Sequence, residues 1–191
     1  LSMCSEIRRA GKPIIIAANK CDQAPQENLD RLMALEGSIV IPTCAEYELA
    51  LRKATDAGLI EYIPGSKTFE ILRPEEMNPA QTRGLETISS FLDKYGSTGV
   101  QKCLETAVYE LLDMIPVYPV EDENKLTDKE GRVLPDVHLL PKGSNARELA
   151  YKVHTDLGDN FIRAIDARTK RVVGQDHELE ANDVITIVAG R

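Results

Sequence analysis

The sequence contains no tryptophan, and aromatic residues make up only 5% of its 191 residues. It also lacks an apolar run of the roughly 20 residues that a membrane-spanning helix requires. Its beginning has neither the basic start nor the apolar stretch of a secretory signal. These absences argue against a membrane protein or an exported protein, and they favour a cytoplasmic location.

Cysteine is scarce, and the four cysteines are Cys4, Cys21, Cys44 and Cys103. None lies within about two to four residues of another, so the sequence has no zinc-knuckle motif. Without an export signal, we interpret them as free thiols in a reducing compartment. The net charge of −8 disfavours broad, nonspecific binding of nucleic acid but leaves room for one local basic patch.

Hydrophobic patterning predicts an α/β arrangement in the first part of the chain. The continuous apolar run at 14–18 predicts a strand buried on both faces, as in a parallel sheet. A second short strand is expected at 38–42, ended by Pro42. Strands that alternate with helices are typical of α/β layers. Helices are predicted over 25–35, 46–57, 78–95 and 100–112, the last with one apolar stripe packed inward, and residues 59–77 are expected to be irregular.

The composition changes near residue 114, where prolines precede an acidic, polar stretch. We therefore divide the chain into two parts, 1–113 and 114–191. The second part reads as a small α+β domain. Its expected strands cover 133–140, 161–167 and 183–188, and its helix follows a cap at Ser144 or Asn145 and ends at Gly158.

The segment with the most informative chemistry is Asn19-Lys20-Cys21-Asp22, which follows the first predicted strand. Ligands of open α/β sheets bind at the carboxyl ends of strands. A carboxylate such as Asp22 accepts both N1–H and the exocyclic amino group of guanine, a donor pair that adenine lacks. Asn19 can bond to N7 and the aliphatic part of Lys20 can cover the base, while the backbone N–H near Ala45 can donate to O6. The alternative is a solvated loop with a capping aspartate.

These residues resemble known motifs. Asn19 to Asp22 resembles the fourth guanine-recognition motif of small GTP-binding domains, Asn-Lys-x-Asp. Thr43-Cys44-Ala45-Glu46 resembles the fifth motif, with Cys44 in place of the usual Ser. In the second part, Leu134-Pro135-Asp136 and the segments 140–144 and 150–158 resemble the TGS domain. Together with residues 96–101 and 118–123, the chain is similar to the YchF branch of the Obg-like GTPases, and most similar to archaeal members.

The resemblance implies a translation-associated GTPase with a partial phosphate-loop-type parallel sheet, followed by a β-grasp TGS domain that engages the ribosome or RNA. Several relatives in that branch depart from Asn-Lys-x-Asp and prefer ATP, so the presence of Asp22 points to GTP. The implied guanine-nucleotide site consists of Asn19, Lys20, Asp22, Cys44, Ala45 and Glu46.

A phosphate loop of the form Gly-x-x-x-x-Gly-Lys-Ser/Thr does not occur in the sequence. Such a loop cradles the phosphates and positions magnesium, which the resemblance assigns to a missing N-terminal half. The chain does not begin with Met, and residues 2–10 read as the end of a helix. We therefore expect a C-terminal portion of a longer protein that alone binds GTP weakly or not at all and does not hydrolyse it.

Basic residues of the second part form a candidate patch for phosphate groups of RNA. The alternative is an ordinary solvated face, because acidic residues lie nearby. The candidate residues are Lys142, Lys152, Arg163, Arg168, Lys170 and Arg171. His154 has no nucleophile or metal partner in the sequence, and we interpret it as a surface or capping residue.

Two other functions stay open at this point. The first alternative is a non-catalytic module that binds RNA or a protein regardless of nucleotide. The second alternative is the regulatory tail of a tRNA synthetase or an alarmone synthetase. Residues 19–22 argue against the second, because those enzymes need no guanine-reading loop beside a TGS domain.

Overall fold

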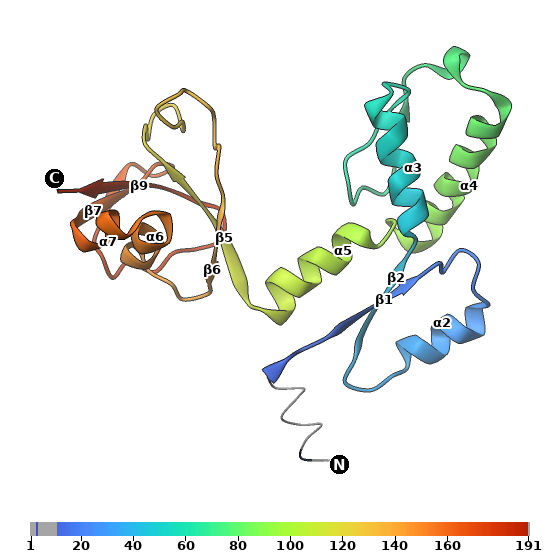
Figure 1. Ribbon diagram of the computed structural model, residues 1–191, viewed down its shortest axis with the longest axis horizontal. Helices are drawn as coiled ribbons and strands as arrows, with labels where there is room; N and C mark the ends of the chain where they lie inside the picture. The colour runs from blue at the N-terminus through green and yellow to red at the C-terminus, as the bar shows by residue number, and fades with distance from the viewer. Residues whose placement is uncertain (1–2, 4–10, 191) are drawn as a thin grey trace. The chain divides into compact units, whose positions relative to one another are not determined.

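The computed structural model describes residue 3 and residues 11–190. Apart from residue 3, the helix end expected over residues 2–10 lies outside this range. The chain divides into two compact units, residues 1–107 (unit 1) and 108–191 (unit 2), which can be followed by colour in Figure 1. The sequence-based boundary between residues 113 and 114 remains a prediction.

Unit 1 is built on two parallel strands, β1 (Ile15–Asn19) and β2 (Ile39–Thr43), joined by helix α2 (Gln26–Met33). The register sets Asn19 opposite Thr43. Because both strands run in the same direction, their carboxyl ends meet at one edge of the sheet. The expected strand–helix–strand order is therefore confirmed.

Two details of these strands differ from expectation. β1 is not buried on both faces, since its two isoleucines are half-buried and Ala17 is exposed; within the described part of the chain, β2 is its one neighbouring strand. β2 does not end at Pro42 but continues to Thr43. Proline is tolerated there because β2 also has a partner on one side only, so an N–H is dispensable at the open edge.

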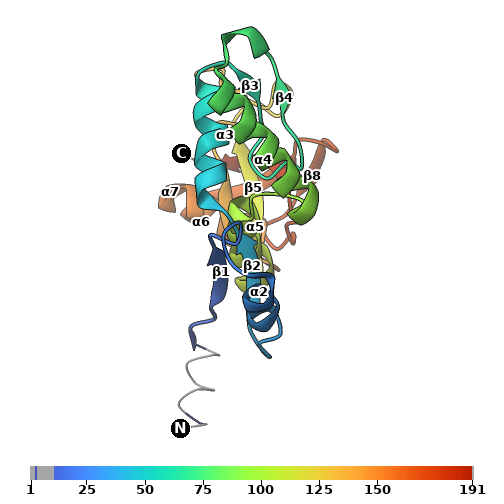
Figure 2. The same cartoon turned by 90° about the vertical axis from the view of Figure 1, so that its right-hand side faces the viewer.

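Helices α3 (Ala45–Asp56) and α4 (Pro79–Tyr95) lie side by side (Figure 2) over a core that includes Leu51, Leu85 and Leu92. The cap predicted at the start of α4 is confirmed, because Asn78 and Gln81 form a reciprocal capping box. The segment between the helices is more ordered than expected. It contains strands β3 (Ile60–Glu61) and β4 (Glu70–Ile71) and the short helix η1 (Pro74–Glu76).

The helix that follows Gly99 is present but buries its apolar stripe only in part. It consists of α5 (Val100–Glu105) and the π-helical segment η2 (Thr106–Leu111). Leu104 and Leu112 are each 58% exposed. From Thr106 onward, a π-helical turn takes up more residues than an α-helical turn, so the later residues of the stripe do not stay on the face of the earlier ones.

Unit 2 is a five-stranded mixed sheet in the order β6-β5-β9-β7-β8, with two helices packed on it. The core between them includes Val117, Leu149 and Ile185, all fully buried. A mixed sheet that wraps a helix is the expected β-grasp arrangement. Its elements are β5 (Met114–Val120), β6 (His138–Pro141), α6 (Ala146–Val153), α7 (Thr155–Asp159), β7 (Phe161–Asp166), β8 (Arg171–Val173) and β9 (Asp183–Ala189).

Strand β5 lies where the sequence indicated a boundary, because Pro116 and Pro119 concealed it. The structure accommodates both prolines by giving the two halves of β5 different partners. Residues 114–117 pair with β6, whereas residues 117–120 pair with β9 on the other side. Each proline thus lies in a half with one open side, where no ladder N–H is needed.

The helical layer of unit 2 also differs in part from the prediction. Asn145 caps α6 in a box with Glu148, as expected. Gly158, however, does not end this helix but lies within α7, because the chain turns at His154. The Nδ1 atom of His154 accepts the N–H of Asp156 at 3.2 Å, which confirms its capping role. The strand expected from residue 133 begins only at His138, and β8 was not anticipated.

Gly99 and Gly84 provide a matched pair for testing the packing of unit 1. Gly99 has φ +82°, and a Cβ there would lie 2.0 Å from the carbonyl oxygen of Pro42, which is backbone and cannot move aside. We expect Gly99→Ala to destabilise unit 1 by about 3 kcal/mol or more. A Cβ at Gly84, within α4, meets nothing within 4 Å, so Gly84→Ala should stabilise unit 1 by about 0.5–1 kcal/mol. Hydrogen exchange of unit 1 amides measures both changes.

Candidate functional site

The carboxyl ends of β1 and β2 carry the two motifs singled out in the sequence, and the fold joins them directly. The Oδ1 atom of Asn19 accepts the backbone N–H of Ala45 at 3.1 Å. The N–H of Cys21 donates to the carbonyl of Thr43 at 3.3 Å. Residues some twenty-five positions apart in the chain therefore form one continuous surface at this edge.

Between Asn19 and Asp22 the chain makes a turn that depends on Lys20. Lys20 has φ 61°, in the left-handed region that non-glycine residues seldom occupy. Such a conformation costs on the order of 1 kcal/mol and is found mainly where the surrounding structure holds it in place. The turn is therefore a built feature, and it leaves the Lys20 side chain exposed beside the strand ends.

Asp22 is held from the second motif. The thiol of Cys44 donates to Oδ1 of Asp22 with an Sγ–Oδ1 distance of 3.2 Å. Burial raises the pKa of the Cys44 thiol to about 11, and the hydrogen bond to Asp22 adds to the effect. The thiol therefore stays protonated and acts as a hydrogen-bond donor to Asp22. The three cysteines in the described part of the chain are free thiols, as predicted.

The two remaining members of the predicted site lie in the first turn of α3. The N–H of Ala45, which the sequence suggested as a donor to guanine O6, is engaged by Asn19 within the protein. The next residue, Glu46, has an exposed side chain, and its N–H is one of the first four of the helix, which have no intrahelical acceptor. The structure thus brings all six predicted residues to one edge of the sheet.

Behind this edge lies a buried carboxylate that sequence reasoning missed. Glu48 of α3 is 4% exposed. Its Oε2 atom accepts the hydroxyls of Thr98 at 2.6 Å and Tyr62 at 2.8 Å. Its Oε1 atom accepts Nε of Arg52 at 2.7 Å. Both oxygens of the buried charge are thus satisfied, as a stable buried carboxylate requires.

We call Glu48 and its partners Arg52, Tyr62 and Thr98 the Glu48 cluster. This cluster supports the site through Thr98. The carbonyl of Thr98 accepts the backbone N–H of Cys44 at 2.9 Å, so the cluster fixes the residue that holds Asp22. Burial by itself raises the pKa of Glu48, but the hydrogen bonds from Thr98, Arg52 and Tyr62 outweigh it and lower the pKa below its ordinary value. The sequence offered one sign of this buried carboxylate. Glu48 lies three positions before Leu51 on the same helix, so it shares a helix face with a residue that is fully buried.

The basic residues of unit 2 do not gather into one patch. Arg163, Arg168, Lys170 and Arg171 belong to the hairpin of β7 and β8, at one edge of the five-stranded sheet. Lys142 directly follows β6, which forms the opposite edge, and Lys152 lies on α6. We call the four hairpin residues the basic hairpin. They share one hairpin, although its register places Arg163 and Arg171 on opposite faces.

The fold and the two joined motifs belong to a known class. Residues 17–122 match the family model described as "Obg-like GTPase YGR210-like, G4 motif-containing domain". Residues 126–189 match the TGS domain, which is a β-grasp fold and bears out the expected architecture of unit 2. The chain belongs to the Obg-like GTPase family, with a motif-four domain followed by a TGS domain, as the sequence resemblance indicated.

Within this class the chain is similar to archaeal proteins. It is 52% identical over 191 residues to an uncharacterized GTP-binding protein of Methanocaldococcus jannaschii, covering 99% of this chain and 48% of that protein. A crystal structure of a GTP binding protein from Pyrococcus horikoshii has 49% identity and a TM-score of 0.74, covering 99% of this chain and 49% of that one. The ribosome-binding ATPase YchF of Buchnera aphidicola is 30% identical over 157 residues, covering 80% of this chain and 33% of that protein.

The chain thus spans about half the length of the archaeal relatives it matches. Residue 3 and residues 11–190 include no group of three or more His, Cys, Asp or Glu residues placed to hold a metal ion. Nor does any helix among them have the length and apolarity to cross a membrane.

The Glu48 cluster yields a test by substitution and pH. We expect Glu48→Gln to destabilise unit 1 by about 2 kcal/mol, because it removes a charged acceptor from three donors. Since the pKa of Glu48 is lowered in the folded state, the wild-type advantage is fully present above the ordinary value of 4.5 and is lost as the pH falls through the folded-state value. Urea denaturation between neutral and acidic pH measures this difference.

The matched control is Glu86→Gln, which changes an exposed glutamate on α4. It should alter stability by no more than about 0.5 kcal/mol at any pH. An equal effect of both substitutions, or a Glu48→Gln deficit that persists unchanged in acid, would contradict a structural role for the buried charge.

Proposed function

We propose that the chain supplies the base-recognition part of a GTP site and a TGS domain through which a translation-associated protein reaches the ribosome or RNA. The observation that carries the proposal is the linked pair of contacts at the strand ends. Asn19 accepts a hydrogen bond from Ala45, and Cys44 donates one to Asp22. These contacts support one shared site rather than two separate loops. A solvated loop with a capping aspartate requires no such link.

The chemistry of the site favours guanine. The Asp22 carboxylate, oriented by Cys44, accepts N1–H and the exocyclic amino group of the base, and the amide of Asn19 reaches N7. The aliphatic part of Lys20 covers the face of the ring. For O6 we propose the N–H of Glu46 as a donor in addition to that of Ala45. The N–H of Ala45 already donates to Asn19 and is therefore shared.

The descriptions of the relatives support a nucleotide function and name different nucleotides. Two archaeal relatives are described as GTP-binding proteins, whereas the Buchnera relative is described as a ribosome-binding ATPase. We assign the chain to the GTP-binding side because a carboxylate at position 22 selects guanine. Hydrolysis, the phosphates and magnesium belong in this proposal to a part of the protein outside these 191 residues, and the setting is the cytoplasm.

Base selection is tested by Asp22→Asn in the whole gene product. We expect the affinity for GTP to fall by about 10- to 100-fold, because the charged acceptor of two hydrogen bonds is lost, while the weak affinity for ATP changes little. Isothermal titration calorimetry with both nucleotides measures the change. Asp56→Asn, at the end of α3, is the control and should leave both affinities as they are.

If Asp22→Asn still prefers GTP over ATP as strongly as the wild type, Asp22 does not select the base. In that case the non-catalytic module, which acts without nucleotide, becomes the better description. The isolated 191-residue chain provides a further check, since without a phosphate loop it should show at most weak GTP binding. Micromolar affinity of the isolated chain would contradict this expectation.

For RNA or the ribosome, we propose the basic hairpin as the contact. Its turn is ordered by Asp166, whose carboxylate accepts the N–H of Arg168 at 2.9 Å and the hydroxyl of Thr169 at 2.5 Å. The ammonium group of Lys170 donates to the carbonyl of Glu123. A rigid turn of this kind presents Arg168 and Arg171 to phosphates at a small entropic cost.

The double substitution Arg168→Glu with Lys170→Glu tests this contact. We expect ribosome or RNA affinity to fall about tenfold or more, with a shallower dependence on salt, because phosphate contacts release counterions. Sedimentation with ribosomes at two salt concentrations measures both effects. The control is Lys142→Glu with Lys152→Glu, which makes the same charge change away from the hairpin; equal losses in the two variants would refute a specific hairpin contact.

A further inference from the structure

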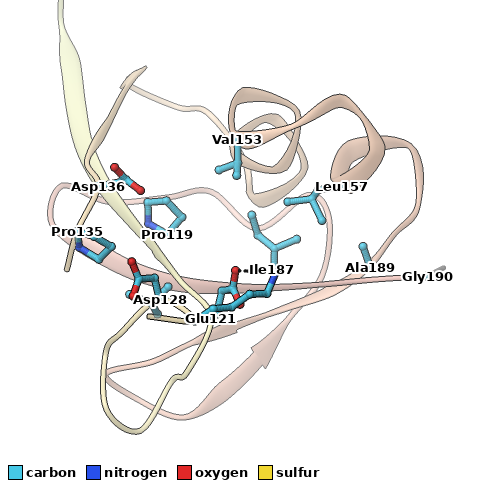
Figure 3. Close-up of a pocket in the computed structure, with 12 residues that line it drawn as sticks. Pro119, Glu121, Asp128, Pro135, Asp136, Val153, Leu157, Ile187, Ala189 and Gly190 are labelled. Atoms are coloured by element: carbon cyan, nitrogen blue, oxygen red, sulfur yellow. Dashed lines mark ion pairs between the residues drawn. The ribbon is translucent and has the colours of Figure 1, made fainter. Parts of the chain in front are cut away.

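Unit 2 contains a groove that the proposed nucleotide and RNA contacts do not use. It has a volume of about 420 Å³ and lies between the helices α6 and α7 and strand β9. Figure 3 shows Val153, Leu157 and Ile187 directed toward the space between these elements, with Pro119 of β5 beside them. These four side chains, together with Ala189, make up an apolar floor, and all five are partly rather than fully buried.

The rim of the groove is acidic. Glu121, Asp128 and Asp136 line it, and Lys129 is the one basic residue among the lining residues described. Lys129 forms an ion pair with Glu121 at 3.2 Å, drawn as a dashed line in Figure 3. Asp136 has no hydrogen-bond or ion-pair partner within residues 11–190. Asp128 is also paired, because Nε of Arg132 lies 2.6 Å from its Oδ2 atom. The rim therefore sets three carboxylates against two cations around an apolar floor, and among the residues described Asp136 is its unpaired charge.

The wall that carries these acidic residues is preformed. It belongs to the connection between β5 and β6, which is ordered by its own hydrogen bonds. Oδ1 of Asp122 accepts the N–H groups of Asn124 and Lys125 at 2.8 and 3.0 Å. Further along, the N–H of Leu134 donates to the carbonyl of Leu126 at 2.9 Å. A ligand of the groove therefore does not have to order this segment, which lowers the cost of binding.

We propose that this groove docks a basic segment of a partner protein, with an aliphatic or aromatic side chain on the floor and Lys or Arg residues at the rim. The apolar floor supplies the anchor site, and the carboxylates supply complementary charge and orientation. Nucleic acid is the wrong occupant, because the rim places carboxylates where phosphates would lie. The groove thus serves a different kind of partner from the basic hairpin, and the proposal does not depend on the guanine site.

The experiment selects ligands from a phage-displayed library of random short peptides against the 191-residue chain. We expect the enriched peptides to combine an apolar residue with several Lys or Arg residues. A synthetic copy of the most enriched peptide is then measured by fluorescence anisotropy. Glu121→Lys with Asp136→Lys should weaken its binding about tenfold and should reverse the salt dependence.

Matched variants separate docking from general charge and from misfolding. Asp176→Lys with Glu178→Lys makes the same charge change outside the groove and should leave peptide affinity within about twofold. Leu157→Ser should weaken binding of the peptide, because it removes an apolar side chain from the floor of the groove. Val172→Ser, at an exposed position of β8, should leave peptide binding unchanged. Circular dichroism verifies that each variant is folded.

Enrichment of peptides without basic residues, or no enrichment at all, would overturn the proposal. So would equal binding of the selected peptide to the wild type and to the Glu121→Lys, Asp136→Lys variant. A single-stranded RNA oligonucleotide serves as the rival ligand. If its binding, rather than that of the peptide, is lost on Leu157→Ser, the groove is a nucleic-acid site and the assignment to a basic protein segment is wrong.

Discussion

The parallel pairing of β1 with β2 is the constraint on which the candidate site depends. It sets Asn19 level with Thr43, so the loop after each strand begins at the same height. A slip of one residue would move every side chain of one strand to the other face and would carry Ala45 away from Asn19. The hydrogen bonds from Ala45 to Asn19 and from Cys44 to Asp22 follow from this register.

The register alone does not fix the loop after β2, and the Glu48 cluster completes the support. Through Thr98 it ties the N-terminus of α3 to the turn between α4 and α5, and through Tyr62 to the segment before β4. A buried charge costs free energy unless its partners are in place, so the cluster tolerates few alternative arrangements. The result is a rigid support behind the site for which we propose base recognition.

The sequence was sufficient where a local signal agrees with the fold. Asn78 before Pro79 predicted the start of α4, and the motif from Asn19 to Asp22 predicted its own place at a strand end. It was insufficient where distant segments decide. The prolines of β5 concealed a central strand, because the pairing of its halves with β6 and β9 cannot be read locally. Glu48 likewise meets partners 14 and 50 residues away.

The burial of the Cys44 thiol limits its chemical reactivity. Burial raises the pKa of this thiol to about 11, and the residue is only 1% exposed, so at neutral pH it stays protonated and shielded from solvent. Because the thiolate is the form that reacts with peroxides and electrophiles, this sulfur is nearly inert. A cysteine at this position can therefore donate a hydrogen bond to Asp22 without adding a reactive thiol to the candidate site.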